Sequence, residues 1–138
     1  MLKIFLRSLF FAAALASPYA ASGEAAVAAG YAAQINNARG IKVTVILENS
    51  ALAAKDLEFR LILETHTQPL SDDLARSAVL IADGKQYQPL GWEGAPPGGH
   101  HRKGRLRFKA VIPQPRALEL QLRLTGETSP RSFQWLLK

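Results

Sequence analysis

All three histidines of the chain fall in two short segments that have the composition of loops. His66 lies in the first segment, whereas His100 and His101 lie side by side in the second. Imidazole nitrogen is a common ligand of copper(II) and zinc, and a complete site needs three or four donor atoms. Nearby carboxylates could supply oxygen ligands: Asp72, Asp73 and Glu93. A copper or zinc site built from these residues is therefore one hypothesis for the function.

The same histidines also have an ordinary structural interpretation. The chain has no cysteine, its single methionine is Met1, and no recognised spacing of metal ligands is present. Neighbouring residues of an extended chain point in opposite directions, so His100 and His101 can share an ion only in a turned loop. One histidine can instead hydrogen-bond the backbone while the other faces water. We therefore predict no cofactor, and keep copper or zinc as the alternative.

The second histidine segment begins with a tryptophan between two glycines and continues through prolines and glycines. Trp92 could be an exposed platform for a sugar or a peptide. A tryptophan in this setting more often closes the end of a sandwich, where proline stiffens the covering loop. The sequence predicts a binding loop made of Trp92, Glu93, His100, His101 and Arg102.

Five cations follow within the eight residues from Arg102 to Lys109. Alternation places three of them on one outer face of a strand, and we call Arg105, Arg107 and Lys109 the basic stripe. Such a stripe could bind anionic lipid, a polysaccharide or an acidic protein. It could equally pair with glutamates of a neighbouring strand. Nucleic acid is not expected as a partner, because export would separate the protein from it and no base-stacking aromatic residues interleave with the charge.

The sequence gives no support for catalysis. Ser71, Asp72 and His66 have the residue types of a hydrolase triad, but no Gly-x-Ser-x-Gly turn exposes the serine. No phosphate-binding glycine loop or dinucleotide-binding motif is present. We predict that the protein is not an enzyme.

The elements that carry these residues follow an amino-terminal segment of different character. Residues 1–22 have the basic, apolar and then small-residue order of a cleaved signal peptide, which predicts a periplasmic or secreted protein. No cysteine is available for a lipid anchor, and we expect no membrane span in the mature chain. Residues 23–39 are an alanine-rich leader or linker. Residues 40–138 are the predicted folded domain.

From residue 41 onward, apolar and polar residues alternate with a period of two, which is typical of strands with one buried face. Seven strands are expected: residues 41–47, 57–63, 78–81, 85–90, 106–112, 118–124 and 133–137. Asp83-Gly84 is suited to a two-residue hairpin turn. The pattern predicts an all-β, antiparallel β-sandwich. Its expected core contains Phe59, Leu61, Leu106, Phe108, Leu120, Leu122 and Trp135.

Two segments also carry a resemblance to known proteins. They are residues 64–74, which begin Glu-Thr-His-Thr, and residues 91–108, which contain Trp-Glu-Gly and Pro-Pro-Gly-Gly-His-His-Arg. In these motifs the chain resembles a group of small exported bacterial proteins and lipoprotein-like domains of unknown function. The resemblance covers roughly residues 40–137 and implies an immunoglobulin-like sandwich. It implies no activity.

These observations together favour an exported, non-enzymatic binding or accessory protein of the cell envelope. An envelope protein or another anionic envelope component is the expected partner, whereas the ligand itself and the oligomeric state are not specified by the sequence. The alternative is a periplasmic copper- or zinc-binding protein.

Overall fold

The computed structural model describes residues 31–49 and 56–137. The predicted signal peptide and residues 23–30 of the predicted leader lie outside the described residues. The described chain forms nine strands and one short helix, in the order β1 (Gln34–Ala38), β2 (Ile41–Asn49), β3 (Asp56–Thr65), α1 (Leu74–Ser77), β4 (Ala78–Ala82), β5 (Lys85–Tyr87), β6 (Gly91–Gly94), β7 (His101–Lys109), β8 (Ala117–Leu122) and β9 (Arg131–Leu136). No helix in these ranges has the length and hydrophobicity needed to cross a membrane.

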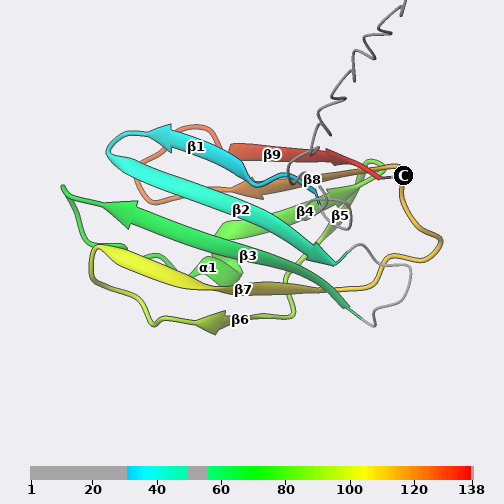
Figure 1. The fold of residues 1–138 in the computed structure, drawn as a ribbon, viewed down its shortest axis with the longest axis horizontal. Coiled ribbons are helices and arrows are strands. Elements are labelled where there is room, and N and C mark those ends of the chain that lie inside the picture. Colours follow the sequence, from blue (N-terminus) through cyan, green and yellow to red (C-terminus); the bar gives the residue numbers. More distant parts are fainter. Residues whose placement is uncertain (1–30, 50–55, 138) are drawn as a thin grey trace, which may run out of the picture.

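The strands form two antiparallel sheets that lie face to face (Figure 1). The five-stranded sheet has the order β1-β2-β3-β7-β6, and the four-stranded sheet has the order β5-β4-β8-β9. The prediction of an all-β fold made of two antiparallel sheets is therefore confirmed. All seven predicted strands are present, although several begin or end a few residues away from the predicted bounds.

The core lies between the sheets, and alternation decides which side chains enter it. In β3, every second residue from Leu57 onward is buried, while the residues between them are partly exposed. Phe59 is fully buried and packs edge to face with Phe108 of β7, with 5.7 Å between ring centroids. Trp135 of β9 lies 5.2 Å from the Phe59 ring and so joins the second sheet to this cluster. All seven residues predicted to lie in the core are buried.

The Asp83-Gly84 turn also has its predicted position, between β4 and β5. Both residues have positive φ, 46° for Asp83 and 83° for Gly84, as a two-residue hairpin turn of this type requires. The Asp83 carboxylate accepts hydrogen bonds from the backbone N–H groups of Arg116 and Ala117, at 3.1 Å. The turn is thereby attached to the start of β8.

Two strands were not expected from the sequence. β1 lies within the segment predicted to be a leader, so the sheet begins before the predicted boundary at residue 40. It has no alternating apolar pattern, because its position comes from backbone pairing with β2 and not from burial. β6 lies within the predicted binding loop and pairs with β7 as the edge strand of the same sheet.

Candidate binding surfaces

Trp92 belongs to β6 and closes one edge of the sandwich. Its indole is half buried against the core, and its Nε1–H donates a 2.9 Å hydrogen bond to the carbonyl of Ala95. Gly94 and Gly104 face each other across β6 and β7 beside this ring. A Cβ added at Gly104 would lie 2.6 Å from the indole and 2.7 Å from the Gly94 Cα, closer than two carbons can approach. The paired glycines therefore make room for a tryptophan that fills the edge of the sandwich and is not a free platform.

Arg102, which the sequence placed in the exposed binding loop, is an interior residue with 1% of its surface exposed. Its guanidinium donates hydrogen bonds to the carbonyls of Leu70 (3.2 Å), Asp72 (2.7 Å) and Ala95 (3.2 Å). It also lies 5.6 Å from the centre of the Trp92 ring. Burial lowers the pKa of Arg102, and the charge of Asp72 opposes this shift. Because these contacts occupy the side chain, Arg102 connects two loops and is not available to a partner.

The two histidine-bearing segments lie side by side, joined by backbone hydrogen bonds. The N–H of Thr65 donates to the carbonyl of His100 at 3.0 Å, and the N–H of Leu70 donates to the carbonyl of Gly99 at 2.8 Å. A third bond runs from the N–H of Gly98 to the carbonyl of Leu70, also at 2.8 Å. The spatial arrangement on which the metal hypothesis depends, one loop beside the other, is therefore present.

The histidine side chains themselves are exposed. The Nδ1 of His101 lies 3.9 Å from a carboxylate oxygen of Glu64, its cross-strand neighbour. Within residues 31–49 and 56–137, no group of three His, Cys, Asp or Glu side chains is arranged to hold a metal ion. The histidines therefore lie at an exposed edge of the loop end. The described residues do not supply a complete set of metal ligands there.

The two aspartates of the first histidine segment hold the backbone. A carboxylate oxygen of Asp72 accepts from the N–H of Thr125 at 3.0 Å and from its hydroxyl at 2.5 Å. The Asp73 carboxylate accepts from the N–H of Ala75 at 3.1 Å and so caps the start of α1. Both side chains are thus used to fix the loop that connects β3 to β4.

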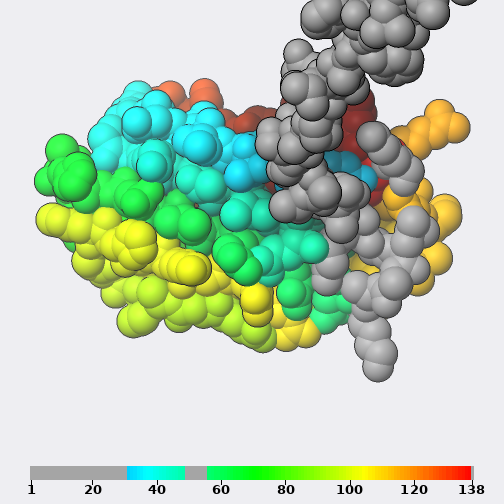
Figure 2. Space-filling view, viewed as in Figure 1, coloured from blue at the N-terminus to red at the C-terminus, as the bar shows by residue number. Residues whose placement is uncertain are grey.

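The basic stripe lies on the outer face of the five-stranded sheet, which faces the viewer in Figure 2. Arg107 is surrounded by carboxylates: its terminal nitrogens lie 2.5 Å from Asp56 and 2.7 Å from Glu93. The Nε of Arg107 is 3.9 Å from Glu58. The pKa of Arg107 is raised, first by its hydrogen bond to Asp56 and next by that to Glu93. Because three acids surround this one cation, Arg107 itself offers no net positive charge to a partner, whereas Lys109 at the end of the strand is exposed.

At the centre of the same face, cations outnumber the carboxylates that pair with them. Arg105 pairs with Glu48 at 2.8 Å, and Arg60 of β3 pairs with the other oxygen of the same carboxylate. A hollow of about 340 Å³ lies at this position. Its lining consists of Arg60, Glu93, Lys103, Gly104 and Arg105. Sequence reasoning missed Arg60 and Lys103 as candidate site residues, because the hollow forms only when β3 and β7 are in register.

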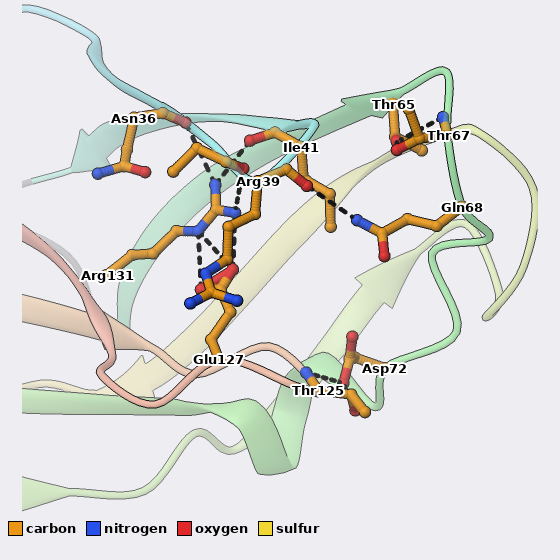
Figure 3. Close-up of polar contacts among 11 residues, drawn as sticks. Asn36, Arg39, Ile41, Thr65, Thr67, Gln68, Asp72, Thr125, Glu127 and Arg131 are labelled. Atoms are coloured by element: carbon orange, nitrogen blue, oxygen red, sulfur yellow. Dashed lines mark hydrogen bonds and ion pairs between the residues drawn. The ribbon is translucent and has the colours of Figure 1, made fainter.

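A second buried arginine was not singled out from the sequence. Arg131 of β9 pairs with Glu127 at 2.7 Å, and both side chains are nearly inaccessible, at 3% and 9% exposure. Its Nη1 donates to the carbonyl of Ile41 (2.7 Å), and its Nη2, which also contacts Glu127, donates to the carbonyl of Ala38 (2.8 Å), both at the β1–β2 turn (Figure 3). We call Arg131 and Glu127 the buried clamp, since they attach the turn of one sheet to the first residue of β9 in the other.

Comparisons of this chain with protein-family models, with curated proteins and with solved structures found no match.

Proposed function

We propose that this chain is an exported, non-enzymatic binding or accessory module of the cell envelope, with an immunoglobulin-like fold. The fold assignment is supported by strand order. When β1 is set aside, β2-β3-β7-β6 and β5-β4-β8-β9 correspond to the two sheets of an immunoglobulin sandwich that has one additional edge strand. Domains of this type usually carry recognition surfaces on a rigid framework.

The functional proposal depends on which polar side chains are bonded within the protein and which are exposed to a partner. Arg102, Asp72 and Asp73, which sequence reasoning placed at candidate sites, are occupied by hydrogen bonds to the protein itself. The exposed charge is instead spread over the outer face of the five-stranded sheet, on strands that are fixed by pairing on both sides. A rigid, charged and exposed sheet face is suited to binding and not to chemistry on a substrate.

Export is tested on protein from the native host. Mass spectrometry of the mature protein is expected to find a new amino terminus between Ser17 and Ala25. An intact Met1 on the folded protein would show that the compartment is wrong.

Binding is tested by sedimenting the purified mature protein with isolated envelope fragments. We expect saturable co-sedimentation that weakens as salt is raised from 50 to 500 mM, about the range in which screening suppresses contacts between exposed charges. A protein that stays in the supernatant at low salt would contradict the proposal.

Metal handling is the alternative function. The observation in its favour is the backbone contact between the histidine loops, Thr65 N–H to His100 carbonyl. The exposed His66, His100 and His101 side chains would then bind copper or zinc together with Asp72 or Asp73. The present hydrogen bonds of both aspartates would have to break first.

A further inference from the structure

The hollow at the centre of the five-stranded sheet lies where like charges meet. Arg60 of β3 is directly opposite Arg105 of β7 in the pairing of the two strands, and Lys103 is the next residue of β7 on the same face. Like charges placed opposite each other destabilise a sheet. A negative charge between these side chains would therefore stabilise the pairing of the two strands.

The protein supplies only part of that charge. One carboxylate, Glu48, contacts both Arg60 and Arg105. Glu93 also lines the hollow, but its carboxylate is bound to Arg107 and makes no hydrogen bond or ion pair with the three cations. No carboxylate in the described part of the chain pairs with the exposed Lys103. Two of the three cations thus share one carboxylate, and the third, Lys103, has no carboxylate partner within the described residues.

The donors that remain are suited to an oxyanion. Arg105 uses only its Nε toward Glu48, and its two terminal nitrogens form no hydrogen bond within the described residues. Side chains of Arg60 and Arg105 are 36% and 48% exposed, so a ligand can reach them from solvent. Guanidinium groups bind phosphate through paired N–H donors, and a lysine adds a point charge.

We propose that Arg60, Lys103 and Arg105 form a binding site for a phosphate-type oxyanion, free or esterified in an envelope lipid. This inference rests on the proposed envelope-binding function and names the chemistry that one of its surfaces recognises. The site spans two paired strands, so the backbone positions that carry its three cations are fixed before the ligand arrives. Glu93 at its border disfavours a second negative group on that side.

The test is an NMR titration of the mature protein with inorganic phosphate, at an ionic strength held constant with sodium chloride. We expect saturable shifts of the backbone amides around Gly104. Lys103→Gln breaks no ion pair and is expected to weaken phosphate binding about tenfold, as the loss of one charge-assisted contact implies. Lys109→Gln is the matched control, because it removes the same charge from an exposed position on the same strand and face.

Vesicles separate the two sources of phosphate. Binding to phosphatidylglycerol vesicles over phosphatidylcholine vesicles, lost in Lys103→Gln but not in Lys109→Gln, would assign the site to a lipid headgroup. Binding of phosphate alone would assign it to a free anion. Absence of saturable shifts, or equal losses in the two variants, would overturn the inference.

The proposed site and the proposed envelope function are disproved by different results. Envelope co-sedimentation that is unchanged in Lys103→Gln, together with absent phosphate binding, would remove the site and leave the function intact. Phosphate binding by a protein that does not co-sediment with envelopes would remove the function and leave the site.

Discussion

The buried clamp makes a sharp prediction about stability. Arg131 and Glu127 are nearly inaccessible, and each is the other's charged partner. Replacing Arg131 with Met leaves a carboxylate that is 9% exposed without a cation. It also removes the donors to the Ile41 and Ala38 carbonyls. Glu127→Gln leaves the guanidinium unpaired but keeps its bonds to those carbonyls.

The magnitudes follow from what each change leaves behind. Removing one partner of a buried ion pair costs about 3–5 kcal/mol, because the other charge stays in a medium that solvates it poorly. Arg131→Met and Glu127→Gln are each expected to lower the free energy of unfolding by about this amount. In the double variant Arg131→Met, Glu127→Gln, no unpaired charge remains. The remaining cost is the loss of hydrogen bonds to the two carbonyls, about 1–3 kcal/mol.

Urea denaturation followed by tryptophan fluorescence measures these free energies, and hydrogen exchange locates the effect. We expect the double variant to be no less stable than either single variant, and amides of β1 to lose protection first in Arg131→Met. The cost of Arg131→Met would refute the reasoning if it were below about 1 kcal/mol. Losses that add up in the double variant would refute it equally, because coupling between the two charges is the basis of the prediction.

Three further changes test the core, the β6 edge and the alternative function. Phe108→Ala is expected to cost about 3–5 kcal/mol in urea denaturation, since it leaves a cavity at a fully buried ring, and a loss below 1 kcal/mol would contradict the packing. Gly104→Ala is expected to lower the melting temperature and to shift the Trp92 fluorescence toward the red, because its Cβ would displace the indole; an unchanged spectrum would contradict this. Calorimetric titration with copper(II) and zinc is expected to show no saturable micromolar binding. Binding that the double variant His66→Ala, His100→Ala abolishes would favour metal handling instead.

The alternation of residues correctly predicted the strands that form the core. In Leu57 to Leu63 and in Leu118 to Leu122, the side-chain period of two can be read from neighbouring residues alone, since it reflects the geometry of a single strand. The Asp83-Gly84 turn could also be predicted from neighbouring residues, because few residue types adopt positive φ at two successive positions. The strands β1 and β6 carry no such pattern, since edge strands are held mainly by backbone pairing.

The sequence alone does not indicate which arginines are buried. Arg102 and Arg105 belong to the same run of cations, yet one is buried and the other is 48% exposed on its side chain. Burial of Arg102 depends on carbonyl acceptors at Leu70 and Asp72, about thirty residues away along the chain. Such acceptors exist only after the loops have packed together.

The sequence by itself thus determined the β class, the alternation of the core and one turn, since these depend on interactions among close neighbours. Tertiary structure decided where charge is available. Arg60 and Arg105 are forty-five positions apart, and only the register of β3 on β7 places them opposite each other. Electrostatic interactions act through space and not along the chain, so one run of cations contains both an ion-paired arginine, Arg107, and a lysine at the hollow, Lys103, that is unpaired within the described residues.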